Sequence, residues 1–315
     1  MNMTRGNGKQ PMDKVIVRLR GGLGNQLFCY AAGRRLAWAN RAELIMDHIT
    51  GFERDHLYLR RYMLDKFNIT ARLASPSERL EPLGRYRRYL AKRVSRILPY
   101  NKSRYIEQKG IEFDARILQL RFKGTLYLDG YWQSEGYFCD IEDIIRQDLI
   151  IKSPGDEANQ EMARRIEDSM NPVCVHMRWF NNATAQADHY DHNLPKDYYQ
   201  NAVKKIQALV TSPCFFVFSE DIDAARHALG RFDDKFIFVN HNRGDEEAYA
   251  DLWLMKQCRH FIIANSTFSW WGAWLGGSKG KVVIAPDIYL KGIAGWGFRG
   301  LIPEAWLLIP AGNKA

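Results

Sequence analysis

The segment from residue 259 to residue 277 constrains the fold more than any other part of the sequence. Its apolar run at residues 261–264 predicts a buried strand, and the apolar stretch at residues 268–275 predicts a helix. A strand that turns directly into a helix is the repeating unit of an α/β protein, and the turn presents backbone N–H groups where such proteins hold phosphate. A buried helix with an ordinary Ser or Thr cap is the alternative that this segment alone leaves open.

The composition allows two folded domains and favours an anionic partner. The chain has 315 residues, of which 46% are hydrophobic and 13% aromatic, enough for two cores of ordinary size. Its formal net charge of +9 suits a nucleotide, a nucleic acid or an anionic membrane surface, and composition does not choose among them. The five cysteines are odd in number and form no Cys-x-x-Cys pair, which favours a reducing, cytoplasmic location.

Neither a secretion signal nor a membrane-spanning helix is expected from the sequence. Residues 1–12 lack the apolar stretch of a signal peptide and predict a disordered lead-in. No segment reaches the roughly 18 continuous apolar residues that a transmembrane helix needs.

Strand-like and helix-like segments alternate along both halves of the chain. In the first half, strands are expected at residues 14–19, 42–46 and 125–129 and a helix at 25–39, whereas residues 51–119 show no clear strand. After a linker-type stretch at 153–155, strands are expected at 173–177, 214–218, 235–239, 261–264 and 281–285, and helices at 156–169, 196–209, 222–229, 245–257 and 268–275. This alternation predicts parallel sheets, so we expect two α/β domains at residues 13–154 and 155–315.

Glycine-rich or polar residues follow four of the expected strands. They are the turn at residues 21–26, His176 with Arg178, Ser219 with Asp221, and the triplet at residues 265–267. Because ligands of α/β sheets bind beyond the carboxyl ends of the strands, these residues are candidates for one site. Arg178 offers a permanent charge on a planar fork that suits two phosphate oxygens. Each group also has an ordinary structural role open to it: a tight turn, a surface ion pair, a core histidine or a helix cap.

Five motifs, in order along the chain, resemble those of the family 11 glycosyltransferases, the α-1,2-fucosyltransferases. They are GGLGNQLFCYAAG at residues 21–33, DGYWQSE at 129–135, LPKDYY at 194–199, FSED at 218–221, and the long aromatic run at 251–277. The resemblance extends from about residue 14 to about residue 310. It implies a GT-B fold, in which two Rossmann-like domains face each other across a cleft. It also implies GDP-fucose as donor, a galactose-bearing acceptor, inversion at the anomeric carbon, and neither a metal nor a further cofactor.

The resemblance assigns roles to particular residues. It implies that residues 13–154 form the acceptor-side domain, that residues 155–315 bind the nucleotide-sugar, and that the last segment packs back on the first domain. Arg178 is then expected to bind the donor pyrophosphate with His176 beside it, and Asp221 to lie near the nucleoside. The full expected donor set is Gly22, Gly24, Asn25, Gln26, His176, Arg178, Ser219, Asp221, Asn265, Ser266, Thr267, Phe268 and Ser269.

One motif departs from the family pattern. Where the family has His-x-Arg-Arg-x-Asp, this chain has Trp179 in place of the second arginine and Asn181 in place of the acid. An amide accepts no proton at neutral pH, so the chain either takes a general base from elsewhere, with His189 or Asp191 in the following loop as the candidate, or manages with little base catalysis. The alternative is that this loop only binds the acceptor; a metal site there is not expected. The expected catalytic set is Arg178, His176, His189 and Asp191.

The departure leaves a second interpretation open, a GT-B transferase with another nucleotide-sugar or acceptor. A third, a basic protein that binds nucleic acid, is less favoured because the charge is concentrated at residues 85–96 and accompanies no nucleic-acid-binding motif. We therefore expect GDP-fucose and a galactose-terminated oligosaccharide or lipid-linked glycan as partners, and no nucleic acid.

Residues 85–98 predict a basic amphipathic helix. Residues 85–96 hold six basic residues and no acidic one, while Tyr86, Tyr89, Leu90, Val94 and Ile97 share one helical stripe. Such a helix suits an anionic membrane surface, which would place the protein at the inner face of the membrane and near lipid-linked glycans. The alternative is a solvated helix that packs on the first domain.

Overall fold

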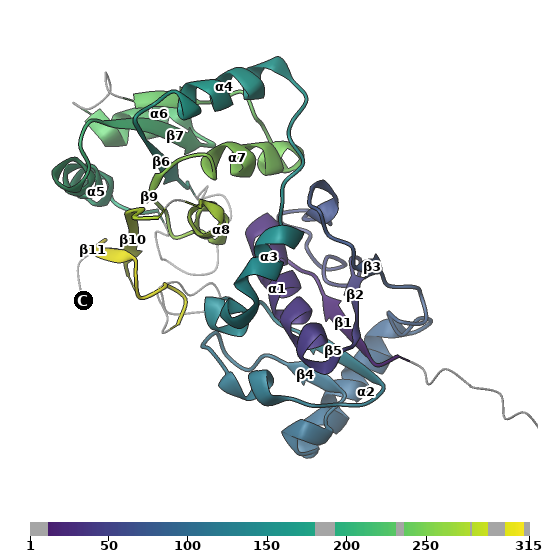
Figure 1. Ribbon diagram of the computed structural model, residues 1–315. Coiled ribbons are helices and arrows are strands. Elements are labelled where there is room, and N and C mark those ends of the chain that lie inside the picture. The colour runs from purple at the N-terminus through teal and green to yellow at the C-terminus, as the bar shows by residue number, and fades with distance from the viewer. Residues whose placement is uncertain (1–11, 180–192, 231–235, 278, 289–299, 312–315) are drawn as a thin grey trace, which may run out of the picture.

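The computed structural model describes residues 12–179, 193–230, 236–277, 279–288 and 300–311 (Figure 1). Within these residues, no helix has both the length and the apolar character needed to cross a bilayer.

The first domain is built on a five-stranded parallel sheet of order β3-β2-β1-β5-β4. Strand β1 is central because its run of β-branched residues is buried on both faces, as expected for a strand covered by helices. The strands are β1 (Lys14–Arg18), β2 (Glu43–Asp47), β3 (Arg72–Leu73), β4 (Tyr105–Glu107) and β5 (Thr125–Asp129). The helices are α1 (Leu23–Asn40), α2 (Gly84–Ile97) and α3 (Glu142–Asp148).

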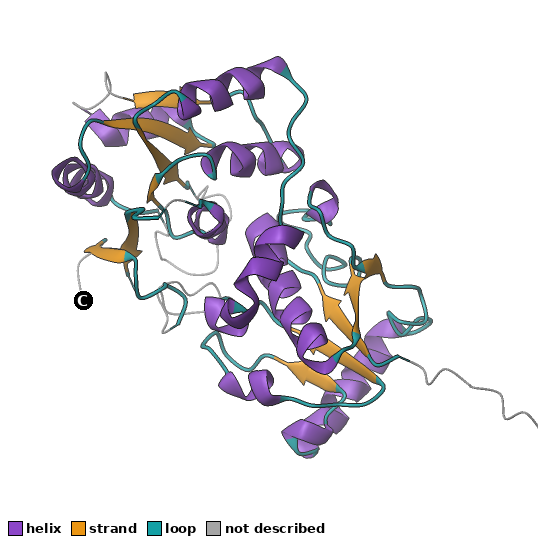
Figure 2. Cartoon of the chain, in the orientation of Figure 1, coloured by secondary structure: helices purple, strands orange, loops and turns teal. Residues whose placement is uncertain are grey.

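The second domain is built on a six-stranded parallel sheet of order β11-β10-β9-β6-β7-β8. Its strands are β6 (Asn171–Met177), β7 (Pro213–Ser219), β8 (Phe236–Val239), β9 (His260–Ile262), β10 (Val283–Asp287) and β11 (Leu307–Pro310). Its helices are α4 (Glu157–Glu167), α5 (Lys196–Leu209), α6 (Ile222–Leu229), α7 (Ala248–Met255) and α8 (Thr267–Leu275). Helices flank both sheets (Figure 2), which confirms the α/β class and the GT-B arrangement of two such domains.

Short 3-10 helices complete the described chain. They are η1 (Leu64–Lys66), η2 (Tyr100–Lys102), η3 (Ala115–Gln119), η4 (Glu135–Tyr137), η5 (Cys139–Ile141) and η8 (Asp245–Glu247). The helix expected at residues 245–257 is thus divided into η8 and the shorter α7. Strands β3 and β4 lie in the stretch where the sequence shows no clear strand, and β11 is a further strand that the sequence analysis missed.

The two domains meet where α1 packs against α8, and Figure 1 shows α8 on the side of the second domain that faces α1 and α3. The ring of Phe28 on α1 lies 4.6 Å from the Trp270 ring and 4.9 Å from the Trp271 ring, measured between centroids. Trp271 Nε1 donates a hydrogen bond to the carbonyl oxygen of Gly24 (2.9 Å), and Trp274 Nε1 donates to Glu135 Oε2 (3.3 Å). The tryptophans of α8 therefore join the domains through one shared aromatic core.

The last described segment contacts both domains. Strand β11 extends the second sheet beyond β10, and the carbonyl of Leu301 accepts a hydrogen bond from Trp270 Nε1 (2.9 Å). Gly300 has φ of +89°, and a Cβ there would lie 3.2 Å from Phe113 Cβ in the first domain.

Candidate active site

The N-termini of two helices from opposite domains meet at this site. Helix α1 begins after Gly21, whose φ is +70°, and Gly22, which caps the helix without a side chain. A Cβ on Gly24 would lie 2.5 Å from the carbonyl carbon of Thr267 and 2.6 Å from the amide nitrogen of Phe268, at the start of α8. Only glycine permits this approach, because both contacts are with backbone. The glycine-rich turn and the turn after β9 are thus brought together, each at the positive end of a helix dipole.

Arg178, a residue of the second domain, directly follows β6 and lies next to the site. It forms an ion pair with Glu220. Burial lowers the pKa of the Arg178 guanidinium, and the positive charge of Arg60 lowers it further. The side chain is mostly covered, so its charge acts in surroundings of low polarity, where an anionic ligand gains more from it than in water.

Arg60 comes from the first domain and was not predicted from the sequence. Its guanidinium lies 3.7 Å from the position that a Cβ of Gly22 would take, and its Nη1 contacts the two carboxylate oxygens of Asp245 at 2.5 and 2.6 Å. The ion pair with Asp245 joins the domains beside the α1 turn. A single arginine in a stretch without a recognisable strand carries no sequence signal, which explains the omission.

His176 is buried next to Arg178, near the end of β6. It pairs in register with Phe218 on β7, is 7% exposed, and its ring centroid lies 5.5 Å from that of Phe268 on α8. Burial, and then the charge of Arg178, lower the pKa of His176 to about 3, so the imidazole is neutral near pH 7. Its Nδ1 is buried and has no hydrogen-bond partner among the described residues.

The turn into α8 presents three half-buried residues, Ser266, Thr267 and Phe268. Ser266 caps the helix, because its Oγ accepts a hydrogen bond from the amide of Phe268 (3.3 Å). Asn265 is 7% exposed. Ser269 is fully buried and its hydroxyl donates to the carbonyl of Ser266 (3.1 Å), so this hydroxyl holds the turn in shape.

The residues after β7 have structural partners. The Asp221 carboxylate caps α6 by accepting a hydrogen bond from the Ala224 amide (2.9 Å). Ser219 Oγ accepts a hydrogen bond from Trp179 Nε1 (3.1 Å) and donates to the carbonyl of Asp221 (3.0 Å). Trp179, the residue that replaces the second arginine of the family motif, therefore fixes the loop that contains Ser219 and Asp221.

The two amides of the α1 turn have different partners. Asn25 Oδ1 accepts a hydrogen bond from Gln133 Nε2 (2.7 Å). Gln26 is fully buried, its Nε2 donates to the carbonyls of Gly21 (2.9 Å) and Arg61 (2.8 Å), and its Oε1 accepts from the amide of Met63 (3.0 Å). In this structure Gln26 shapes the turn and connects it to the Arg60 segment.

The expected base residues, His189 and Asp191, lie outside the described residues, as does Asn181. Within the described part of the chain, no group of three or more His, Cys, Asp or Glu residues is arranged to hold a metal ion.

Comparison with known proteins identifies the family. The sequence profile of Glycosyl transferase family 11 matches residues 14–291. The chain belongs to glycosyltransferase family 11. This confirms the resemblance drawn from the motifs and makes the protein a glycosyltransferase.

Two Escherichia coli proteins are similar to this family 11 chain over most of its length. An alpha-1,2-colitosyltransferase is 29% identical over 292 residues, which cover 89% of this chain and 93% of that protein. The O-antigen biosynthesis glycosyltransferase WbnK is 30% identical over 314 residues, with 92% and 98% coverage. Among solved structures, the alpha-1,6-fucosyltransferase NodZ soaked with GDP-fucose is 15% identical, with a TM-score of 0.49 over 84% of this chain and 92% of that one.

Proposed function

We propose that this family 11 glycosyltransferase transfers fucose from GDP-fucose to the 2-hydroxyl of a galactose-bearing acceptor glycan, with inversion at the anomeric carbon. The observation that carries the proposal is that Arg178, after the carboxyl end of β6, is close enough to Arg60 for their charges to interact, and that Arg60 lies beside Gly22, where the N-termini of α1 and α8 converge. A covered arginine and two positive helix ends favour a pyrophosphate group. The E. coli relative that is named an alpha-1,2-colitosyltransferase supports the same 2-hydroxyl chemistry.

In the proposed reaction, the 2-hydroxyl oxygen of the acceptor bonds to the anomeric carbon as that carbon's bond to the β-phosphate oxygen breaks. GDP leaves with the electron pair, and Arg178 and the N-terminus of α8 offset the negative charge that develops on it. His176, in its neutral form, holds the end of β6 that carries Arg178 in position. One of its ring nitrogens is available to form a hydrogen bond with the phosphate. The acceptor proton passes to His189 or Asp191, or to water if the loop serves only to bind the acceptor. No step in this scheme requires a metal ion or a further cofactor.

A second candidate is transfer of another sugar, such as colitose, from its nucleotide donor. Two observations favour keeping it: the similarity to a colitosyltransferase, and Trp179 in place of the second arginine, with its indole bound to Ser219. In this second proposal, Trp179 changes the donor contacts near Ser219, while Arg178 keeps its place on the pyrophosphate.

Calorimetry with GDP, GDP-fucose, GDP-mannose, UDP-galactose and the nucleotide donor of colitose, followed by transfer assays with each donor and NMR of the product formed on a galactose-terminated acceptor, separates the candidates. The proposal expects binding of GDP and GDP-fucose and a product fucosylated at the 2-hydroxyl with the anomeric configuration opposite to that of the donor. Binding of UDP-galactose alone, or transfer only from a different GDP-sugar, would reject fucose as the natural donor.

A further inference from the structure

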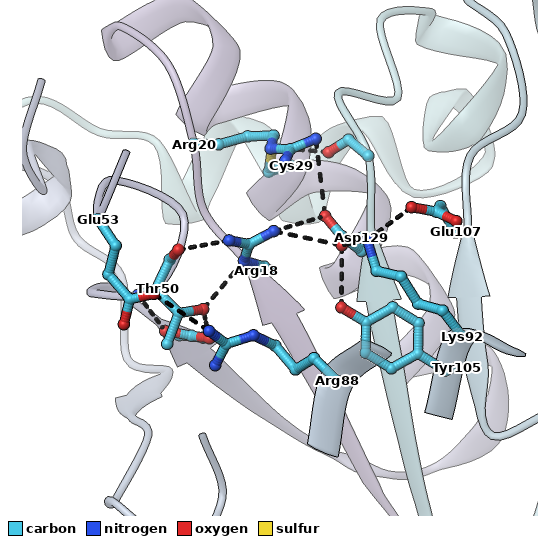
Figure 3. Close-up of polar contacts among 12 residues, drawn as sticks. Arg18, Arg20, Cys29, Thr50, Glu53, Arg88, Lys92, Tyr105, Glu107 and Asp129 are labelled. Atoms are coloured by element: carbon cyan, nitrogen blue, oxygen red, sulfur yellow. Dashed lines mark hydrogen bonds and ion pairs between the residues drawn. The ribbon is translucent and has the colours of Figure 1, made fainter. Parts of the chain in front are cut away.

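Helix α2 attaches to the first domain by its charged face (Figure 3). Arg88 pairs with Glu53 (3.1 Å), and Lys92 pairs with Asp129 (2.8 Å). Lys92 Nζ also lies 2.5 Å from Glu107, a residue of β4. The Lys92 contacts run from the inner face of α2 to the carboxyl ends of β4 and β5, and the Arg88 contact reaches the segment after β2.

The anchor of this network is the buried carboxylate of Asp129, at the end of β5. Besides Lys92, it contacts Arg18 (3.3 Å), Arg20 (3.6 Å) and the hydroxyl of Tyr105 (2.9 Å). Burial alone would raise the pKa of Asp129, but the surrounding cations outweigh it and lower the pKa to about 2. Asp129 therefore stays ionised, and its ion pair with Lys92 fixes which face of α2 turns inward.

The opposite face of α2 is apolar and exposed. Five residues at helical spacing form this outer stripe and are between 42% and 83% exposed: Tyr86, Tyr89, Leu90, Val94 and Ile97. An ordinary surface helix has the reverse arrangement, with its apolar stripe on the core and its charges in water. The sequence analysis left open a solvated helix packed on the first domain; in the structure α2 does pack on that domain, but by its charged face, and the stripe is exposed.

Exposed arginines accompany the outer stripe: by helical position Arg85 and Arg87 lie at its two margins, and Arg93, four residues after Tyr89, lies within it. Arg85, Arg87 and Arg93 are exposed, and within the described parts of the chain no carboxylate lies at salt-bridge distance from them. Arg93 lies over the ring of Tyr89, 5.1 Å from its centroid, and Arg87 donates to the backbone carbonyls of Leu80 and Glu81. The exposed face of α2 is thus both apolar and basic, and it is free of acidic side chains.

We propose that the outer stripe and the exposed Arg85, Arg87 and Arg93 dock this glycosyltransferase on an anionic lipid bilayer, with α2 lying in the plane of the interface. Charge complementarity selects this occupant, because arginines without carboxylate partners suit lipid phosphates, while the stripe enters the region between headgroups and acyl chains. The network around Asp129 holds α2 on the acceptor-side domain, so docking would present that domain to glycans on lipid carriers. The inference does not depend on the identity of the donor sugar.

Co-sedimentation of the full chain with vesicles tests this proposal. Wild-type protein is expected to bind vesicles that contain phosphatidylglycerol, to bind phosphatidylcholine vesicles far less, and to dissociate at high salt. The double variant Leu90→Asp/Ile97→Asp should lose at least about tenfold in partitioning, since each of two apolar anchors is replaced by a charge that the lipid repels. The matched control is Met170→Asp/Leu209→Asp, two exposed positions on the second domain, which should bind as wild type does.

Circular dichroism and melting temperature verify that both double variants are folded, which they should be because the changed residues are exposed. Failure of the wild type to bind anionic vesicles at low salt overturns the proposal. Equal binding by the α2 variant overturns it as well. Dimerisation that the α2 substitutions abolish, in a protein that ignores vesicles, assigns the face to a second copy of the chain instead.

Discussion

Arg178 is the residue on which the proposed chemistry depends most. Arg178→Lys keeps the positive charge but replaces the planar fork with a single ammonium group, which binds two phosphate oxygens less well. We expect turnover to fall about a hundredfold, which corresponds to roughly 3 kcal/mol of lost transition-state stabilisation. Steady-state kinetics with the preferred donor measure this, and Arg165→Lys on the exposed side of α4 is the control. A variant that keeps a third of wild-type activity would exclude Arg178 from the site.

Arg60 allows a comparison between two neighbouring ion pairs that join the domains. Arg60 pairs with Asp245 beside the α1 turn, whereas Arg61 pairs with Glu246 in an exposed position. If Arg60 contributes to the charge that binds pyrophosphate, Arg60→Ala should weaken GDP binding by about tenfold, as expected for a lost charge-assisted hydrogen bond. Arg61→Ala should change GDP affinity little, because exposed ion pairs contribute at most about 1 kcal/mol. If calorimetry shows equal losses of GDP affinity for the two variants, Arg60 does not contribute to the binding site.

His176 links the site to the pH dependence of stability. Its pKa is about 3 in the folded protein and near 6.5 when unfolded, so between these values the unfolded state binds one more proton. The stability that depends on neutral His176 is complete above about pH 6.5 and falls by about 1.4 kcal/mol for each pH unit below it. Urea unfolding near pH 7 and pH 5 should show this loss for wild type and a shallower dependence for His176→Asn. Parallel pH profiles would show that His176 is accessible to protons when folded.

At the scale of elements, the sequence predicts strands and helices that have a strong local hydrophobic pattern. It misses short strands whose formation depends on the neighbouring strands with which they pair. The central strands β1, β6 and β7 are continuous apolar runs and were predicted. Strand β4 has only three residues, and β3 has two exposed ones, so neither leaves a hydrophobic pattern.

The apolar stripe of α2 could be recognised in the sequence, but the sequence did not show whether the stripe faces the first domain or the solvent. Its direction follows from the pairing of Lys92 with Asp129, residues that are far apart in the chain. For the same reason, the sequence could place Gln26 and Ser269 in the right turns but could not show that their polar groups bind backbone.

Because α1 and α8 are in close contact, one methyl group added at Gly24 is expected to have a severe effect on binding and stability. Gly24→Ala would place Cβ 2.5 to 2.6 Å from backbone atoms of Thr267 and Phe268, which cannot move without shifting α8. We expect the two helix N-termini to separate, GDP binding to weaken by at least about tenfold and the protein to lose about 1–3 kcal/mol of stability. Gly155→Ala is the control, since no atom lies within 4 Å of its added Cβ. Unchanged GDP affinity in a folded Gly24→Ala protein would show that the approach of α1 to α8 is not needed for binding.

At the scale of the whole molecule, the aromatic core shared by α1 and α8 couples the two domains. Phe28 and Phe138 of the first domain pack against Trp271 of the second, with ring centroids 4.9 and 5.4 Å apart. We therefore expect the two domains to unfold together in one thermal transition. A ligand that binds at the domain contact should then stabilise the whole protein.

GDP should raise the temperature of that transition, and EDTA should not cancel the effect. At a hundredfold excess over the dissociation constant, linkage adds about 2.7 kcal/mol of stability, which corresponds to a shift of several degrees for a chain of this size. The charge of GDP is offset in our proposal by Arg178 and the ends of α1 and α8, groups that a chelator does not remove. Differential scanning calorimetry with GDP, with and without EDTA, measures the shift, and Arg178→Lys should reduce it. A shift that appears only with added magnesium or manganese would mean that a cation supplies the charge assigned here to Arg178 and the two helix ends.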